Sequence, residues 1–157
     1  MDPSFLLKED SQVVKKDSLA VKFLKGFVRV HIGLYQLVKG RGLIGKHTIL
    51  VTTVGRKSGQ SRTRPLYAVK DGNDYIVLAS FGGSPQHPDW YLNLQANPQV
   101  TIQDRNKTLS TIASTVEDEA ERERLWSKMI AIYAGYNDYQ QRTERKIPVV
   151  RLSPQPA

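Results

Sequence analysis

Residues 52–66, with the sequence TTVGRKSGQSRTRPL, gather four cations, two glycines and several hydroxyls between two apolar runs. The cations are Arg56, Lys57, Arg62 and Arg64. Guanidinium groups bind phosphate or carboxylate through paired hydrogen bonds, and glycines allow a tight turn with exposed backbone N–H groups. Arg62 and Arg64 alternate along the start of an expected strand, so both side chains should point to one face. The segment predicts an anion site, with a solvated basic hairpin as the alternative. Its spacing is not that of a Walker loop.

A second candidate is the segment ASFGGSPQHPDWYLNL, in which an expected strand ends at Ser80 and opens into two glycines. Glycine lets a flat ligand approach the backbone closely. Trp90 and Tyr91 are candidates for the wall of a ligand pocket. The alternative is that Trp90 and Leu94, four residues apart, form the core face of a short helix.

Three tyrosines, Tyr133, Tyr136 and Tyr139, recur at a spacing of three residues. In a helix they would share a face, for which core packing is the usual explanation. Gly135 and Asn137 interrupt that helix, which favours a mobile aromatic segment instead. A tyrosine hydroxyl can donate a hydrogen bond or a proton to a substrate oxygen.

The composition of the chain excludes several kinds of catalytic and metal-binding site. The 157 residues fit one domain with a real core, and the net charge of +8 favours an anionic partner such as nucleic acid, a membrane surface or a polyanionic small molecule. The absence of cysteine excludes disulfides and thiol catalysis, and the three histidines have no metal-ligand spacing. No acid–base pair or nucleophilic triad is visible, so an enzyme of this sequence would take its chemistry from a bound cofactor.

The N-terminal part of the chain differs from the rest. Residues 1–16 are expected to form a flexible polar arm, and residues 17–46 a basic amphipathic helix with its linker. The helix packs either on its own domain or on a membrane surface. No signal peptide and no apolar run of about 18 residues is present. We therefore expect a cytoplasmic protein, with residues 18–38 available for peripheral contact with the inner face of the cell membrane.

Residues 47–157 are expected to form the main domain. Strands are predicted at residues 47–54, 64–70 and 74–80, within a second hairpin at 99–116, and at 146–152, where Pro148 indicates an edge strand. Helices are predicted at 89–98 and at 117–139, the latter with an acidic first turn and a break at Gly135. Because the strands come in hairpins, we predict an α+β barrel of about six mainly antiparallel strands, not a doubly wound sheet.

These residues resemble a known family. The segments LVTTVGRKSGQSRTRPLYAVKDGNDYIVLAS, HPDWYLNLQANPQV and YAGYNDYQQRTERKIPVV are similar to those of the deazaflavin-dependent nitroreductases, from about residue 48 to residue 152. Members are actinobacterial enzymes that use reduced coenzyme F420 to reduce quinones, nitroimidazoles and related acceptors. The segment G-R-K-[ST]-G-Q, followed at this distance by W-Y-L-N-L, is the specific part of the resemblance.

The resemblance implies a split β-barrel that holds the deazaflavin in a groove, with the phosphate and oligoglutamate tail of the coenzyme on the cationic segment. The residues that match the family's coenzyme contacts are Arg56, Lys57, Ser58, Arg62, Thr63, Arg64, Pro65, Leu66, Leu78, Ala79, Ser80, Phe81, Asp89, Trp90, Tyr91, Leu92 and Asn93. No metal is implied.

The resemblance also implies the catalytic roles. Hydride would pass from the deazaflavin to a quinone, nitroaromatic or activated-alkene acceptor, and Ser80 or Tyr136 would hydrogen-bond the acceptor's oxygen, with Tyr133 nearby. Two positions depart from the family. Phe81 stands where a lysine is expected, and Arg64 where a small polar residue is common. Both departures bear on acceptor choice more than on the coenzyme.

Three alternatives stay open at this point. The barrel could bind FMN, which has one phosphate and no polyglutamate tail. It could bind the deazaflavin without catalysis. The charge of +8 also fits a nucleic-acid protein, but the cations lie in a loop and a helix and not along an aromatic strand face, so no nucleic-acid partner is expected.

Overall fold

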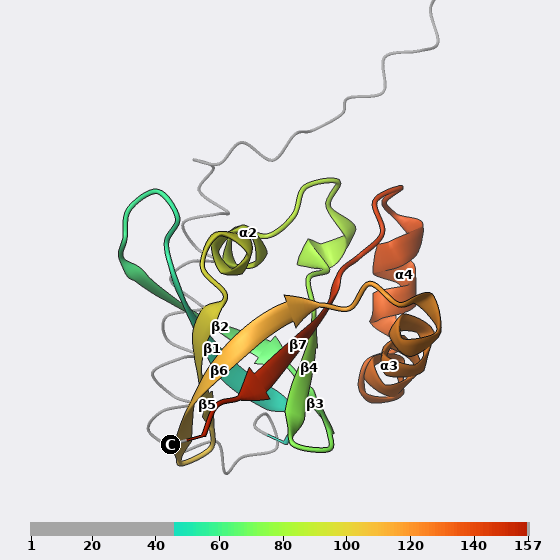
Figure 1. The fold of residues 1–157 in the computed structure, drawn as a ribbon. Coiled ribbons are helices and arrows are strands. Elements are labelled where there is room, and N and C mark those ends of the chain that lie inside the picture. The colour runs from blue at the N-terminus through green and yellow to red at the C-terminus, as the bar shows by residue number, and fades with distance from the viewer. Residues whose placement is uncertain (1–45, 157) are drawn as a thin grey trace, which may run out of the picture.

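Seven antiparallel strands form one curled sheet in the computed structural model, which describes residues 46–156 (Figure 1). Along the sheet the order is β2-β1-β5-β6-β7-β4-β3, so neighbours in space come from distant parts of the sequence. The strands are β1 (Thr48–Val54), β2 (Ser61–Tyr67), β3 (Val69–Asp71), β4 (Asp74–Leu78), β5 (Gln99–Asp104), β6 (Lys107–Thr115) and β7 (Val149–Pro154). The prediction of an α+β antiparallel barrel is confirmed, with seven strands in the described part in place of about six.

Turn chemistry places two hairpins where the sequence predicts them. β3 and β4 are joined across Gly72, whose φ of 62° is the left-handed conformation that glycine adopts without strain. β5 and β6 are joined at Arg105, which adopts a φ of 56°. The β3–β4 hairpin follows from a local glycine signal, whereas the β5–β6 hairpin places Arg105 in a conformation that is uncommon for a residue other than glycine.

The prediction that residues 64–70 form one strand paired with residues 74–80 is wrong. The first part of that segment belongs to β2, which pairs with β1 from Ser61 to Tyr67, and only β3 pairs with β4. The division falls at Ala68, whose backbone N–H donates to the carbonyl of His47 at 2.8 Å. This bond keeps the chain beside the start of β1 until Ala68, and the chain then crosses to β4.

The edge position predicted for the last strand is also wrong. β7 lies between β6 and β4, with hydrogen-bonded neighbours on both sides. Pro148 is compatible with this because it precedes the first residue of β7, so its missing N–H removes no bond from the ladder. Its carbonyl accepts a hydrogen bond from the backbone of Ala79 at 3.0 Å.

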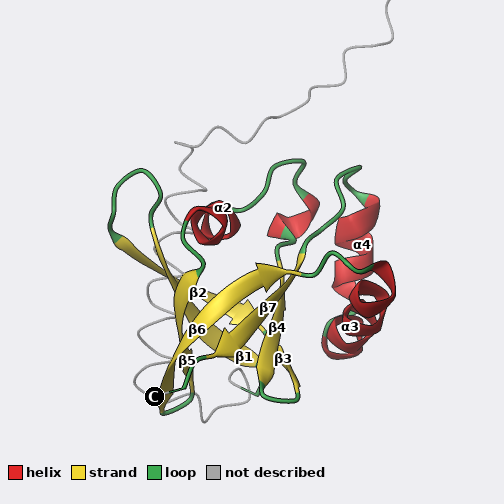
Figure 2. Cartoon of the chain, viewed as in Figure 1, coloured by secondary structure: helices red, strands yellow, loops and turns green. Residues whose placement is uncertain are grey.

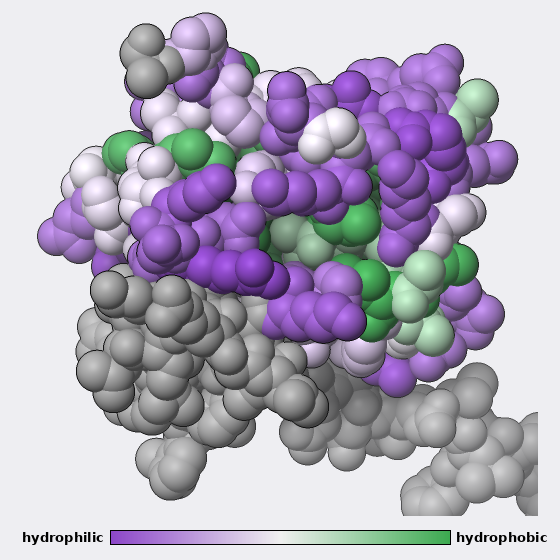
Figure 3. Space-filling view, turned by 90° about the horizontal axis from the view of Figure 1, so that it is seen from below, coloured by the Kyte–Doolittle hydropathy of each residue, from purple (hydrophilic) through white to green (hydrophobic). Residues whose placement is uncertain are grey.

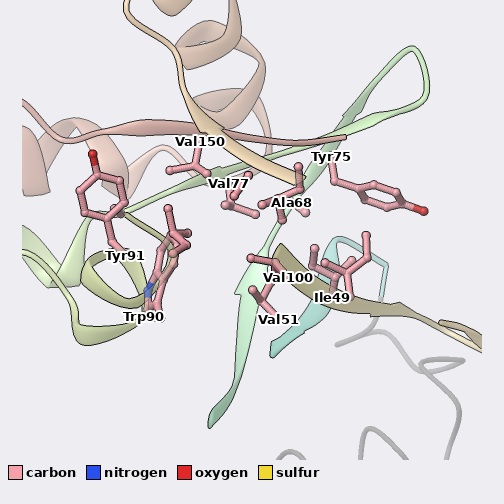
Figure 4. Packing of buried hydrophobic residues seen from close by; sticks show 14 residues of the cluster. Ile49, Val51, Ala68, Tyr75, Val77, Trp90, Tyr91, Val100 and Val150 are labelled. Atoms are coloured by element: carbon pink, nitrogen blue, oxygen red, sulfur yellow. The ribbon is translucent and has the colours of Figure 1, made fainter. Parts of the chain in front are cut away.

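Apolar side chains fill the inside of the curled sheet (Figure 4). Val51, Val77 and Val150 come from three different strands and are fully buried. Trp90 and Tyr91 project into the same cluster from a helix at one end of the barrel. Since this interior is packed with side chains, the barrel offers its ends and its outer surface to a ligand.

Three α-helices and one short 3₁₀ helix surround the sheet in the described part (Figure 2). They are η2 (Phe81–Gly83), α2 (Asp89–Ala96), α3 (Glu119–Ile132) and α4 (Gly135–Gln141). α2 lies over one end of the barrel, and the α3–α4 pair lies beside β4 and β7 (Figure 1). The predicted break near Gly135 is confirmed, because α3 ends at Ile132 and α4 begins at Gly135.

Ion pairs fix α3 to the sheet. Asp118 caps the helix by accepting the N–H of Glu121 at 2.8 Å. Arg124 donates to both carboxylate oxygens of Asp71, at 2.9 and 2.6 Å, and Lys128 donates to the same carboxylate at 2.6 Å. These bonds hold the pKa of Asp71 well below its usual range. The β3–β4 turn therefore sets the position of α3, and with it of the tyrosines that follow.

Several predictions for the N-terminal part lie outside the described residues, namely the arm at 1–16 and the helix at 17–46 with its membrane contact at 18–38. The single-domain division at residue 47 stays a prediction. Within residues 46–156, every helix is too short or too polar to span a bilayer.

The Asp71→Asn variant should unfold more easily than the wild-type protein, by about 1 kcal/mol at pH 7, because two partly exposed ion pairs are lost. Since the pKa of Asp71 is lowered by folding, this difference should be complete above about pH 4 and should shrink as the pH falls below that value. Urea denaturation at pH 7 and pH 3 measures it. Glu123→Gln, on the same helix and without an ion pair to residues 46–156, is the control. An equal difference at both pH values would contradict the assignment.

Candidate functional site

The loop between β1 and β2 forms a tight turn built on two glycines. Gly55 donates its N–H to the carbonyl of Gln60 and accepts the N–H of Gly59, both at 2.8 Å. A Cβ at Gly55 would lie 2.7 Å from the Ser58 hydroxyl oxygen, and Gly59 has a φ of 65°. The predicted turn is therefore present, and it leaves Lys57 and Ser58 exposed.

Arg56 attaches this loop to helix α2. Its backbone N–H and its guanidinium both donate to the side-chain oxygen of Asn93, each at 3.1 Å, and the guanidinium also pairs with Asp89 at 3.3 Å. Asn93 is buried, and its amide donates to the Thr53 hydroxyl at 3.2 Å. Residues that were predicted only as separate ligand contacts thus bind one another. The loop is held in place before any ligand arrives.

The other three cations of the segment are exposed and form no ion pair with residues 46–156. Lys57 lies in the turn, and Arg62 and Arg64 lie two residues apart on β2, where they face Thr53 and Val51 of β1 in the register. Alternate residues of a strand share one side, so both arginines project from the same face, as predicted. This leaves a concentration of positive charge beside the loop.

The segment after β4 has an unusual backbone. Phe81, Gly82 and Gly83 follow one another with φ values of 48°, 64° and 81°. A left-handed conformation strains a bulky residue such as phenylalanine, whose side chain is 57% exposed here. A Cβ at Gly83 would lie 2.6 Å from the carbonyl oxygen of Tyr139, so glycine is needed for the contact with α4. The sequence indicates the glycines but not the conformation of Phe81.

The three predicted tyrosines form one cluster, although they do not share one helix. Tyr133 caps the end of α3, while Tyr136 and Tyr139 belong to α4. The Tyr133 and Tyr139 hydroxyls share a hydrogen bond of 2.9 Å, and the Tyr136 ring meets the Tyr133 ring edge-on, with centroids 5.1 Å apart. Tyr136 is only 6% exposed, and burial raises the pKa of its phenol.

Tyr67 is a fourth member that sequence reasoning missed. Its ring lies 5.7 Å from that of Tyr133, centroid to centroid, and its side chain is exposed. Its one signal in the sequence is its place at the end of the strand that carries Arg62 and Arg64. Strand β2 therefore runs from the cationic loop to the aromatic cluster, with Tyr67 on the face of the strand opposite to that of Arg62 and Arg64. From Arg62 to Tyr67 this strand spans about 17 Å.

The remaining predicted residues are mostly inaccessible. Trp90 and Tyr91 pack in the barrel core, which is the alternative that the sequence left open for Trp90. Leu78, Ala79 and Asn93 are buried, and Thr63, Pro65, Leu66, Ser80 and Leu92 are partly buried. Asp89 is exposed but occupied by Arg56. Among the predicted residues, a ligand can most readily reach the three exposed cations, Ser58, Phe81 and Tyr133.

A separate pocket of about 380 Å³ lies at the other end of the barrel, where apolar side chains sit in a hollow among hydrophilic ones (Figure 3). Lys46, Ile49, Lys70, Tyr75 and Asp104 are among its lining residues. It contains none of the residues predicted for the site. Within residues 46–156 no group of side chains could hold a metal ion.

The chain matches a family model described as F420H(2)-dependent quinone reductase over residues 27–154. It is 38% identical to an F420H(2)-dependent quinone reductase of Mycobacterium tuberculosis over 134 residues, which cover 80% of this chain and 89% of the relative.

Solved structures agree with this match. The structure of an F420-H2 dependent reductase, FDR-A, superposes with a TM-score of 0.64 at 42% identity, covering 69% of this chain and 95% of that one. An FAD-binding protein of Mesorhizobium loti shares the fold alone, with a TM-score of 0.52 at 12% identity, over 87% of this chain and 88% of that one. The fold is thus the split β-barrel, and the chain belongs to the F420H(2)-dependent quinone reductase family, as a reductase that uses coenzyme F420.

Proposed function

We propose that the protein binds reduced coenzyme F420 along strand β2 and reduces a quinone beside the tyrosine cluster. The anionic part of the coenzyme would lie on Lys57, Arg62 and Arg64, and the flat ring near Ser80 and Phe81. The observation that carries the proposal is the succession of three exposed cations along the β1–β2 loop and the first half of β2, followed by an aromatic cluster at Tyr67, the last residue of that strand.

The cationic end fits a polyanion. The exposed cations have no carboxylate partner within residues 46–156, so a phosphate or glutamate group would meet no internal competitor there. Arg56 plays a different part, because Asp89 and Asn93 already occupy its guanidinium. Its role is to hold the loop, so that the other cations keep their positions before binding.

The aromatic end fits a flat apolar acceptor. Tyr67, Phe81 and Tyr133 are large side chains that stay exposed, whereas the other aromatic rings of residues 46–156 are mostly packed. Bound reduced coenzyme F420 supplies a hydride. The chain supplies orientation and hydrogen bonds, and it forms the apolar surface on which a quinone ring can rest.

Two hydroxyls can stabilise the charge that develops on the acceptor oxygen. Those of Ser80 and Tyr136 have no hydrogen-bond partner among residues 46–156, whereas the Tyr133 hydroxyl is bonded to Tyr139. A phenol is protonated at neutral pH, and burial raises the pKa of Tyr136 further, so its hydroxyl can donate. We assign Ser80 and Tyr136 to the acceptor oxygen, and Tyr133 to the adjoining wall.

The coenzyme assignment is tested by fluorescence titration with oxidised coenzyme F420 beside FMN, at low and high salt. We expect tight, salt-sensitive binding of F420 and weak binding of FMN, because only F420 carries the polyglutamate tail. Lys57→Gln should weaken F420 binding about fivefold, equivalent to about 1 kcal/mol. Lys107→Gln, a lysine at the start of β6, should leave it unchanged. Equal effects of both substitutions would remove the loop from the binding site.

Tyr136→Phe should lower turnover of a quinone such as menadione by about tenfold to a hundredfold, because the acceptor oxygen loses a donor. Affinity for F420 should change less than twofold, roughly, since the ring stays in place. Steady-state kinetics and the same titration measure both quantities. Tyr139→Phe is the comparison, because the Tyr139 hydroxyl is bonded to Tyr133, and its turnover should fall less. Undiminished turnover in Tyr136→Phe would exclude this tyrosine from the reaction.

The membrane contact rests on the sequence alone. Replacing Lys22, Lys25 and Arg29 by glutamine should reduce co-sedimentation with anionic liposomes, since each basic residue near such a surface contributes about 1 kcal/mol. Neutral liposomes are the control, because they should bind the wild-type protein and the variant equally. Undiminished binding to anionic liposomes would exclude residues 18–38 as the anchor.

A further inference from the structure

One arginine outside the predicted site holds the strained segment after β4. Arg145 follows α4 in the sequence, and its guanidinium donates to three backbone carbonyls of that segment. The bonds run to Ala79 at 3.1 Å, to Ser80 at 2.7 Å and to Ser84 at 2.7 Å. One rigid fork thus binds the segment on both sides of Phe81.

A fourth contact completes the arrangement. The guanidinium lies 3.3 Å from Nδ1 of His87, and because arginine can only donate, this nitrogen is the acceptor. Burial, together with the charge of Arg145, lowers the pKa of His87 and so keeps the ring neutral. The chain from residue 79 to residue 87 is therefore folded around a single cation.

Arg145 is itself held by α4. The Gln140 side chain donates to the Arg145 carbonyl at 2.9 Å and accepts the N–H of Ile147 at 2.9 Å. The Thr143 hydroxyl accepts the Arg145 N–H at 3.3 Å. Since α4 carries Tyr136, the position of this tyrosine is coupled to that of Ser80 through one guanidinium.

The segment needs such support. Three consecutive left-handed residues include Phe81, for which this conformation costs about 1–2 kcal/mol. A strained backbone persists only where its surroundings determine it. The segment's own support consists of two backbone bonds, from the N–H of Gly83 to Ser80 and from that of Ser84 to Phe81, and of the bond from the Gln86 N–H to the Ser84 hydroxyl at 3.2 Å. The charge-assisted bonds of Arg145 are stronger than these.

We propose that Arg145 is a positioning residue for acceptor reduction, because it sets Ser80 and Phe81 relative to the tyrosines of α4. It is not a catalytic residue, since its N–H groups point at backbone carbonyls. The inference rests on the proposed function for its effect on turnover. Its effect on the segment stands independently of that function.

The experiment compares Arg145→Gln, Arg145→Lys and Arg122→Gln in the full chain. Arg122 is the matched control, because it also donates to a backbone carbonyl, that of Ile147 at 2.9 Å, but does not touch the segment. Hydrogen exchange of the Gly83 and Ser84 amides reports on the segment. Fluorescence titration reports on F420 binding, kinetics with menadione report on kcat and KM, and thermal melting shows that each variant is folded.

We expect Arg145→Gln to accelerate exchange of these two amides about tenfold or more, with exchange in β5 and β6 unchanged. We expect kcat to fall about tenfold or more, with F420 affinity changed less than about threefold. Arg145→Lys should retain only part of the wild-type amide protection and kcat, since a point charge cannot replace the fork. Arg122→Gln should affect neither the two amides nor kcat.

Two results would overturn the inference. One is unchanged exchange of Gly83 and Ser84 in folded Arg145→Gln or Arg145→Lys protein. The other is a loss of kcat no larger than that of Arg122→Gln. If the wild-type protein reduced no quinone, the proposed function would fail, while the exchange measurement would still decide whether Arg145 holds the segment.

Discussion

The packed interior of the barrel is the constraint on which the rest of the structure depends. Side chains from β1, β4 and β7 fill it, and Trp90 and Tyr91 close one end. A ligand therefore cannot enter the packed interior, and polar groups that act on one must lie on loops, on helix ends or at the exposed ends of the barrel. The start of strand β2 meets this requirement, because Arg62 and Arg64 share a face with Thr53 and Val51 yet stay exposed. The proposed site follows that strand.

Each end of the proposed site is held by contacts from outside it. At the cationic end, Asn93 binds both Thr53 and Arg56, so the turn is attached to α2. At the aromatic end, Asp71 fixes α3, and Arg145 joins α4 to the segment after β4. Neither support depends on a ligand. Both ends are thus arranged in advance, which lowers the entropy lost when a long, flexible coenzyme binds.

The sequence predicts what local chemistry determines. Glycine turns, the β3–β4 hairpin, the break before α4 and the cationic loop all depend on neighbouring residues, and all are present. Contacts across long stretches of sequence were not predictable in this way. Pro148 suggested an edge strand because its neighbours in space were unknown, and Tyr67 was missed because Tyr133 lies far from it in the sequence. In the sequence Arg145 resembles any other surface cation, and only the structure shows its three carbonyl partners.

The two departures from the family pattern affect opposite ends of the proposed site. Phe81 places an exposed ring where a lysine is expected, so the acceptor end loses a cation and gains apolar surface. Arg64 adds a cation on β2, nearer the proposed tail of the coenzyme. A negatively charged acceptor would bind more weakly beside a phenylalanine than beside a lysine, whereas a neutral quinone can stack on the phenylalanine ring. Within the proposed function, Phe81 favours an uncharged, flat acceptor, as the sequence led us to expect, whereas Arg64 strengthens the hold on a polyanionic coenzyme and so differs from that expectation.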